Sequence, residues 1–323
     1  MADKKIEKYD VVVVGGGASG LVAGLFTSRR VLKTLIISQD IGGQAATTPE
    51  IENYPGYDKV DGLDLMKKFK SQAEKFGAQF KLETVESIES LPENRYRINA
   101  NTFSAEAEAV ILAFGLSHRH LNIPGEAEHV GKGVFYCAIC DPKYYQDKKV
   151  VIVGGGSSAV QAALSISDLA KEVWIVNVTK ALNAETILCQ RLKESKKIKV
   201  ILNATTKEIK GNDWVKNIVI VHKENNQEES LSYDCVFVEI GYVAKADWVK
   251  ELVETDQRNQ IKISPNCETN KPGIFAAGDI TTIAFKQVVI SAGEGAKAAL
   301  QAHQYLLTKQ GKRAGNIDWG KKK

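Results

Sequence analysis

The chain has 323 residues and a formal net charge of +4, part of it in the last three lysines, so its charge makes no case for a nucleic-acid partner. Hydrophobic residues make up 44% and charged residues 25%, as in an ordinary globular protein with room for about two domains. Five cysteines form no disulfide framework, the first residues lead into a strand instead of a signal peptide, and apolar runs such as 109–114 are too short to cross a bilayer, so we expect a cytoplasmic protein with no membrane partner.

The first strong pattern is a strand, a glycine-rich turn and a helix. Four consecutive valines, Val11–Val14, predict a strand buried on both faces of a parallel sheet. Residues 15–20 follow with the GxGxxG spacing, and residues 21–29 are helical in pattern. Together they form a dinucleotide fingerprint, in which glycines let the backbone approach a pyrophosphate at the helix N-terminus. Ser38 stands where an acidic residue would hold a ribose, with Asp40 two residues further on.

The segments up to residue 115 complete the first unit. The sequence predicts glycine turns at 42–44 and 53–56, an amphipathic helix at 62–76, antiparallel strands at 80–88 and 95–99, and a buried strand at 109–115.

The centre of the chain carries a Cys-x-x-Cys pair, Cys137 and Cys140, followed by Asp141 and Pro142. Two cysteines at this spacing can form a reducible disulfide, and Asp-Pro predicts a helix start, which would lower a thiol pKa. The alternatives are half of a zinc site or two core cysteines. Zinc needs four ligands, and no second close pair of cysteines or histidines supplies them, so a redox pair is favoured and no metal is expected.

The pattern of the first unit then restarts. Val150–Val153 predicts a second buried strand, and residues 154–159 repeat the fingerprint with Ala159 in place of the third glycine. A helix at 160–170 and strands at 172–177 and 236–241 complete this unit. The repeat predicts an α/β fold with two Rossmann-like, three-layer dinucleotide-binding domains.

The C-terminal part adds a strand that ends in Gly278 and Asp279 and a helix from about residue 286 to 307. A carboxylate at the end of a strand can accept hydrogen bonds from a polyol. A simple turn with a helix cap is the alternative for Gly-Asp taken alone.

Two Rossmann units with a Cys-x-x-Cys pair in the second resemble the low-molecular-weight thioredoxin reductases of the flavin disulfide reductase group, in particular the members that lack the basic NADPH 2′-phosphate motif. The resemblance implies a homodimer with a discontinuous FAD-binding domain, 1–117 and 247–323, into which an NAD(P)-binding-like domain, 118–246, is inserted. It implies FAD contacts at Gly15, Gly17, Ala18, Ser19, Gly20, Asp40, Gly43, Gln44, Asn53, Gly278, Asp279, Lys286, Gln287 and Val288. It assigns the NAD(P) loop to Gly154, Gly156, Ser157, Ser158 and Ala159.

The same resemblance implies catalytic roles. Cys140 would lie next to the flavin, Cys137 would attack the substrate disulfide, and Asp141 would donate and accept the thiol proton. Lys132 and Tyr144 would face thioredoxin. Segments 117–120 and 243–246 would be hinges, and we expect His118 and His120 in the first to be surface residues.

The second dinucleotide loop departs from the family pattern. Family members that use NADPH have basic residues where this chain has Asn177, Val178, Thr179 and Asn183, which leaves Lys180 as the nearby cation, and Gln161 replaces a family glutamate. Asn177 is also not the acid that an NADH site would use. One hypothesis is weak NADPH or NADH use, and the other is a different donor such as reduced ferredoxin.

The sequence therefore predicts an FAD-dependent dithiol–disulfide oxidoreductase, a thioredoxin reductase. Electrons would pass from the donor through FAD to Cys137–Cys140 and on to thioredoxin or a similar small disulfide protein. The alternatives are a related reductase of another disulfide substrate and a flavin redox sensor that does not turn over.

Overall fold

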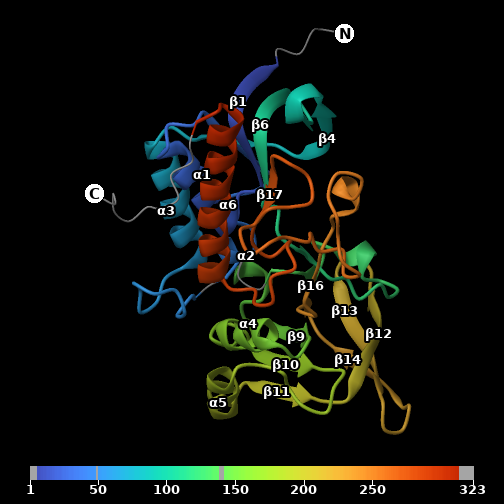
Figure 1. Ribbon diagram of the computed structural model, residues 1–323. Helices are drawn as coiled ribbons and strands as arrows, with labels where there is room; N and C mark the ends of the chain where they lie inside the picture. The colour runs from blue at the N-terminus through green and yellow to red at the C-terminus, as the bar shows by residue number, and fades with distance from the viewer. Residues whose placement is uncertain (1–5, 49, 138–141, 313–323) are drawn as a thin grey trace. The chain divides into compact units, whose positions relative to one another are not determined.

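The structure, a computed structural model, describes residues 6–48, 50–137 and 142–312 (Figure 1). The chain forms two compact units. Unit 1 comprises Met1–Leu116 and Ala244–Lys323, and unit 2 comprises Ser117–Val243. The predicted fold class, an α/β fold with two Rossmann-like domains and the second inserted into the first, is confirmed.

Unit 1 is built on a seven-stranded sheet in the order β3-β2-β1-β6-β5-β4, with β17 also paired to β6. The strands are β1 (Glu7–Val14), β2 (Thr34–Ser38), β3 (Gln79–Leu82), β4 (Val85–Leu91), β5 (Arg95–Ala100), β6 (Ser104–Leu112) and β17 (Ile274–Ala276). The helices are α1 (Ala18–Ser28), α2 (Gly43–Ala46), α3 (Gly62–Lys75) and α6 (Val288–Lys309), with short 3-10 turns at Pro92–Asn94 and Asp247–Val249.

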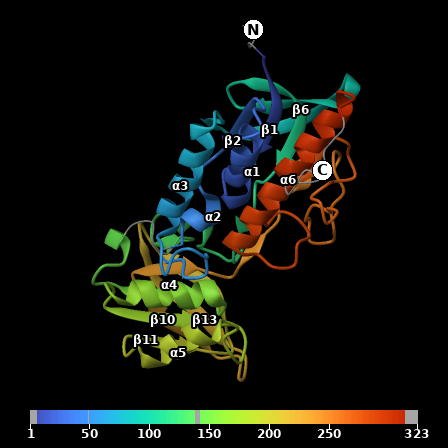
Figure 2. The same cartoon turned by 60° about the vertical axis from the view of Figure 1, so that its left-hand side comes forward.

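The four valines of β1 are buried on both faces, as their sequence predicts. Val11 and Val13 face a core shared with residues of α1, α3 and α6, which cover that face of the sheet (Figure 2). Val12 and Val14 face a second core with β5 and with residues 246–280. Because both faces of β1 are packed, the glycine turn that follows Val14 starts from a fixed position at the end of the strand.

One predicted strand is divided in the structure. Residues 80–88 were expected to form a single antiparallel strand, but β3 pairs in parallel with β2 and only β4 pairs antiparallel with β5. The physical reason is the break at Glu83 and Thr84, where the Glu83 N–H still bonds to Ser38 at the end of β2 before the chain turns toward β5.

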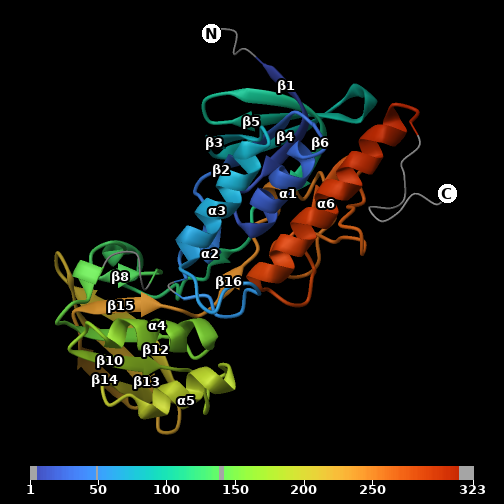
Figure 3. The same cartoon turned by 90° about the vertical axis from the view of Figure 1, so that its left-hand side faces the viewer.

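Unit 2 has a parallel five-stranded sheet in the order β11-β10-β9-β15-β8, with helices on one face and an antiparallel three-stranded sheet on the other (Figure 3). The elements are β7 (Ser117–His118), β8 (Val134–Phe135), β9 (Lys149–Val153), α4 (Ser157–Ser167), β10 (Glu172–Val176), α5 (Thr186–Glu194), β11 (Ile198–Ile201), β12 (Ala204–Gly211), β13 (Val215–His222), β14 (Glu228–Ser232), β15 (Cys235–Val238) and β16 (Tyr242–Val243), with 3-10 turns η2 (Ala127–His129) and η3 (Pro142–Tyr144).

The chain enters and leaves unit 2 through two short strands that pair with each other. Ser117 of β7 lies opposite Val243 of β16, and His118 lies opposite Tyr242. The Arg119 N–H extends the pairing by donating to the Gly241 carbonyl at 2.9 Å. None of the helices in the described part of the chain combines the length and apolar character needed to cross a bilayer.

The helix expected to start at Pro142 is a single 3-10 turn, Pro142–Tyr144. The reason is local packing: the Tyr144 ring stacks on Phe135 with 4.5 Å between centroids, and Tyr145 is buried against Phe237. A helical turn therefore begins at Pro142 as predicted, and it is one 3-10 turn long. Cys140 and Asp141 lie outside the described residues, so an effect of this turn on a thiol pKa stays a prediction.

Candidate functional site

The first glycine turn is shaped to admit a ligand on one side. Gly15 has φ +115, and a Cβ there would lie 2.2 Å from the Ala113 carbonyl oxygen, so this position requires glycine. A Cβ at Gly20 would lie 1.9 Å from the Gly15 carbonyl oxygen, which brings α1 close to the turn. At Gly17, by contrast, the nearest atom would be 3.9 Å away. The open side at Gly17 fits a pyrophosphate at the start of α1.

Hydrogen bonds from neighbouring polar groups fix the conformation of this turn. The Ser38 hydroxyl accepts a hydrogen bond from the Gly16 N–H at 2.8 Å. The Gly42 N–H donates to the Gly16 carbonyl at 2.7 Å, and the Asp40 carboxylate accepts from the Gly43 N–H at 2.9 Å. The structure therefore brings the predicted residues Asp40 and Gly43 to the turn, and it adds Ser38 as a support.

The end of β17 comes to the same turn. A Cβ at Gly278 would lie 2.5 Å from the Ser19 hydroxyl, so α1 and the Gly278 turn are in close contact. Ser291 donates to the Asp279 carboxylate at 2.8 Å. Burial raises the pKa of Asp279, while Ser291 and Lys286 oppose the rise. This carboxyl keeps one oxygen for an acceptor role toward a polyol.

Residues far apart in sequence meet near the start of α6. The Asn53 side-chain amide donates to Gln287 at 3.1 Å, although 234 positions separate them. Gln44 donates to the Leu116 carbonyl at 2.9 Å, and Lys286 donates to Thr281 at 2.7 Å. Burial lowers the pKa of Lys286, and the nearby Asp279 opposes that change. With an open glycine cradle and a polyol acceptor in one unit, the residues fit FAD.

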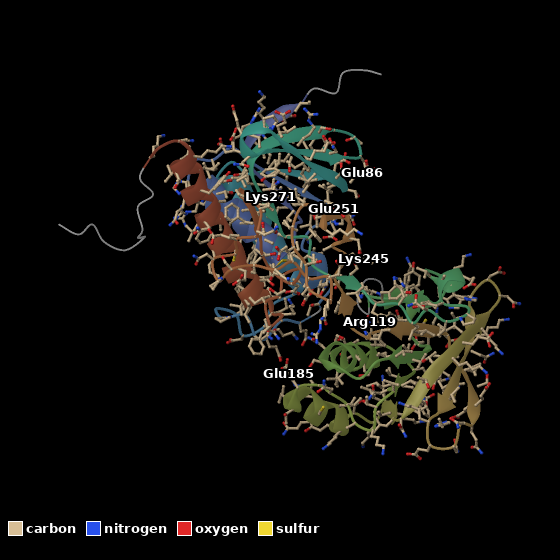
Figure 4. The ribbon with its side chains drawn as sticks, turned by 45° about the vertical axis from the view of Figure 1, so that its right-hand side comes forward. Glu86, Arg119, Glu185, Lys245, Glu251 and Lys271 are labelled. Carbon is tan, nitrogen blue, oxygen red and sulfur yellow. The ribbon has the colours of Figure 1, made fainter. Side chains whose placement is uncertain are left out.

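The second glycine turn repeats the first. Gly154 has φ +142, and a Cβ there would lie 2.0 Å from the Glu239 carbonyl oxygen, whereas a Cβ at Gly156 would meet nothing within 4 Å. Ala159 is fully buried where the first turn has its third glycine. The Ser157 hydroxyl accepts from the N–H of Glu185, the residue labelled in Figure 4 just before α5, at 3.0 Å. The backbone of a dinucleotide loop is therefore present.

Asn177, at the end of β10, uses its side chain inside the protein. Its amide donates to the Thr179 hydroxyl at 2.7 Å and to the Ala181 carbonyl at 2.9 Å, and it packs beneath Gly155. Lys180 is exposed. A second cation, which sequence analysis missed, reaches the same loop: Lys223 donates to the Val178 carbonyl at 3.4 Å.

Sequence analysis also missed a buried carboxylic acid behind this loop. Glu239 follows β15 and is 9% exposed. Burial raises its pKa to about 7, and a hydrogen bond with the Ser158 side chain opposes the rise. Ser158 belongs to the first turn of α4, so this acid stands next to the position where a pyrophosphate would bind.

The cysteines divide into two groups. Cys137 is partly buried, and Cys140 and Asp141 lie outside the described residues, so their pairing and roles stay predictions. The other three cysteines are free thiols, and two of them are fully buried. Burial raises the pKa of Cys235 to about 12 and raises that of Cys267, so neither is a ready thiolate.

Within the described ranges, no group of three or more acidic, histidine and cysteine side chains is arranged to hold a metal ion.

The residue before Cys137 joins a hydrogen-bonded chain. The Tyr136 hydroxyl donates to the buried Glu126 carboxylate at 2.8 Å and lies 2.7 Å from Nδ1 of His120. His120 is exposed as expected, but His118 is partly buried and its pKa is lowered, mainly by burial. The predictions that Lys132 and Tyr144 face a partner are not tested by this geometry. Lys132 is exposed, and the Tyr144 ring packs on Phe135.

Comparisons with known proteins agree with this arrangement. Residues 9–302 match the family model described as pyridine nucleotide-disulphide oxidoreductase. Thioredoxin reductase of Bacillus subtilis is 36% identical over 95% of this chain and 96% of its own length. A component of the alkyl hydroperoxide reductase of Pseudomonas aeruginosa is 34% identical over 93% of this chain, and the match spans only 59% of that longer protein.

Solved structures give the same result. The thioredoxin reductase of Lactococcus lactis superposes with a TM-score of 0.89 at 33% identity, over 93% of this chain and 99% of that one. A ferredoxin-flavin thioredoxin reductase of Clostridium acetobutylicum gives a TM-score of 0.52 at 29% identity, over 94% and 99%. The chain therefore belongs to the pyridine nucleotide-disulphide oxidoreductase family and is a flavoenzyme of the thioredoxin reductase type.

Proposed function

We propose that this protein is an FAD-dependent reductase of a small protein disulfide, thioredoxin, and that Cys137 and Cys140 form its redox pair. The observation that carries the proposal is the pair itself. It is the only Cys-x-x-Cys spacing in the sequence, and the remaining cysteines stand singly, with Cys235 and Cys267 fully buried. The family and the B. subtilis relative support the substrate class.

Unit 1 would hold the cofactor. The open side at Gly17 and the start of α1 would receive the pyrophosphate, and the Asp279 carboxyl would accept hydrogen bonds from the ribityl hydroxyls. Gln44, Asn53 and Gln287 would line the flavin end. FAD bound there supplies the transfer of electrons from a donor to the disulfide.

The cysteine chemistry is a dithiol–disulfide exchange. Two electrons and two protons convert the Cys137–Cys140 disulfide to two thiols. The Cys137 thiolate attacks the substrate disulfide and releases one substrate thiolate, which takes up a proton from Asp141. The Cys140 thiolate then attacks the mixed disulfide, which releases the second substrate thiol and restores the Cys137–Cys140 bond.

The domain assignment belongs to the same proposal. An FAD-binding domain of residues 1–117 and 247–323 would carry the inserted domain 118–246, and segments 117–120 and 243–246 would act as hinges. The strand β7 lies in the first segment and its partner β16 ends at the first residue of the second, which supports a joint there. The homodimer and the cytoplasmic location stay predictions.

We further propose that the physiological donor is not NADPH. Asn177 turns its amide inward, and two lysines, Lys180 and Lys223, replace a cluster of arginines that could hold a 2′-phosphate in bidentate fashion. Reduced ferredoxin is the proposed donor. The likeness to the C. acetobutylicum enzyme, whose name includes ferredoxin, supports it.

Anaerobic reduction of the flavin tests the donor, and oxidised thioredoxin tests the acceptor. Reduced ferredoxin should bleach the flavin absorbance of the purified protein, and NADPH should do so far more slowly. The reduced protein should then release two thiols per thioredoxin disulfide.

Cysteine variants separate the pair from the background. Cys137→Ser and Cys140→Ser should retain FAD and lose thioredoxin reduction, whereas Cys189→Ser, a matched control at a single cysteine, should keep it. Thioredoxin reduction by Cys140→Ser would overturn the role of the pair. A wild-type protein whose reduced flavin never passes electrons to a disulfide would instead be a redox sensor.

A further inference from the structure

Glu239 lies on the helix side of the second sheet, at the edge where dinucleotides bind. In β15, Cys235 and Phe237 pack with α4, while Val236 and Val238 face the antiparallel sheet. The alternation of a strand places the next odd residue, Glu239, on the side of α4. Its hydrogen bond with Ser158 agrees with that position. The strand and helix can be followed in Figure 3.

The first unit has an alanine at the equivalent position. The Ala113 N–H donates to the Val14 carbonyl at 2.7 Å, just as the Glu239 N–H donates to the Val153 carbonyl at 2.8 Å. The carbonyl of Ala113 abuts Gly15, and that of Glu239 abuts Gly154. Ala113 and Glu239 are therefore structural equivalents. Unit 1 has a methyl group where unit 2 has a carboxyl group.

No positive charge balances this carboxyl within the described part of the chain. The helix α4 carries no charged residue, β8 carries none, and the charged residue of β9 is Lys149, at the far end of the strand. The other titratable group of β15 is Cys235, at the opposite end. Burial, which raises the pKa of Glu239, outweighs the Ser158 hydrogen bond, which lowers it.

The loop itself is open, because a Cβ at Gly156 would meet nothing within 4 Å. A ligand would meet no steric block at Gly156, so a charge beside the loop is the means of exclusion that this structure offers. We propose that Glu239 is a built-in anion at the start of α4 that excludes the pyrophosphate of a dinucleotide from unit 2. The carboxylate occupies the favourable field of the helix N-terminus and repels a second anion there.

This mechanism makes binding dependent on pH. Because the pKa of Glu239 is raised to about 7, the acid is mostly neutral at about pH 6 and mostly ionised at about pH 8. Dinucleotide affinity of the wild-type protein should therefore fall as pH rises through neutrality. The inference rests on the proposed function only for the identity of the donor, since it explains why unit 2 would not deliver electrons from a nicotinamide.

Binding of ADP-ribose, followed by calorimetry, tests the inference without any turnover. It carries the pyrophosphate but no nicotinamide, and FAD-loaded protein keeps the first loop filled. Glu239→Gln and Glu239→Ala should bind ADP-ribose up to about tenfold more tightly than the wild type at about pH 8, with a smaller difference at about pH 6. Glu185→Gln is the matched control. It removes one exposed carboxylate at the same loop, where water screens the charge, and should change affinity less than about threefold.

Equal affinity of the wild type and both Glu239 variants at about pH 8 would overturn the inference. So would the absence of binding to every variant at millimolar ADP-ribose, because the loop and not Glu239 would then exclude the ligand. Neither result bears on thioredoxin reduction by the dithionite-reduced protein, which tests the proposed function separately.

Discussion

The two glycine turns of this chain share their backbone contacts down to single hydrogen bonds. The Gly42 N–H reaches the Gly16 carbonyl at 2.7 Å, and the Asn183 N–H reaches the Gly155 carbonyl at the same distance. Gly17 pairs with Gly42 as Gly156 pairs with Asn183. The side chains behind the turns differ: Ser38 and Ala113 in unit 1, Asn177 and Glu239 in unit 2. A dinucleotide loop can thus keep its backbone while the residues that support it differ in size and charge.

The largest expected effect on ligand binding comes from placing in the first turn an acid equivalent to Glu239 of the second turn. Ala113→Glu would place a carboxylate beside the proposed FAD pyrophosphate. One pair of unit charges about 4 Å apart interacts by roughly 4 kcal/mol at an effective dielectric constant of 20. An acid whose pKa is raised to about 7, like that of Glu239, can take up a proton instead, so FAD affinity should fall up to about tenfold at about pH 8. The flavin-to-protein ratio after purification measures this loss.

Ala113→Gln is the control for that change, since it adds nearly the same volume to a buried position without the charge. It should retain clearly more flavin than Ala113→Glu. Equal flavin contents in the two variants would show that crowding, and not charge, governs this place.

The next effect concerns stability and its dependence on pH. The pKa of Glu239 in the folded protein, about 7, lies above its ordinary value of 4.5. The folded state therefore binds the proton more tightly, and this contribution to stability is complete below about pH 4.5 and is lost as pH rises through about 7. A shift of this size corresponds to at most about 3 kcal/mol.

Glu239→Gln removes that loss, so it should raise the melting temperature more at about pH 8 than at about pH 5. Thermal unfolding of the wild type and the variant at both values gives the comparison. A variant that shifts the melting temperature equally at both would contradict a raised pKa in the folded protein.

The smallest expected effects are on the free energy of unfolding and concern Asn177 and Ser38, the side chains that hydrogen-bond beneath the two turns. Asn177→Ala removes the three hydrogen bonds that this buried amide donates, to the carbonyl and hydroxyl of Thr179 and to the carbonyl of Ala181, which should cost about 2 to 3 kcal/mol. Ser38→Ala removes the acceptor for the Gly16 N–H and should cost about 1 to 2 kcal/mol. Denaturant unfolding measures both. A larger loss for Ser38→Ala would reverse the proposed order of the supports.

The sequence predicted what depends on neighbouring residues. The buried runs Val11–Val14 and Val150–Val153, each followed by a glycine turn and a helix, led to the correct fold class because strand, turn and helix are all local signals. The Asp-Pro signal correctly indicated that a helical turn begins at Pro142, but it could not give the length of that turn, which ends where Tyr144 and Tyr145 pack against Phe135 and Phe237.

Contacts across long separations could not be predicted. Asn53 meets Gln287 only because the fold brings the start of α6 to the first unit's loops. Glu239 lies beside Gly154, 85 positions earlier in the sequence, and the sequence did contain a signal for this contact. Ala113 and Glu239 each stand two residues before a glycine, Gly115 and Gly241, so aligning the two repeats exposes the one acid that breaks the pattern.

The pairing of Ser117 with Val243 has a consequence for the history and the engineering of this chain. The two ends of unit 2 are partners in one ladder, so they lie about 5 Å apart. A segment whose ends meet in this way can be spliced into the surface turn of another protein, or deleted and replaced by a tight turn, without stretching its host. The inserted unit can thus be moved as a single block, and gene fusion can exchange it between relatives.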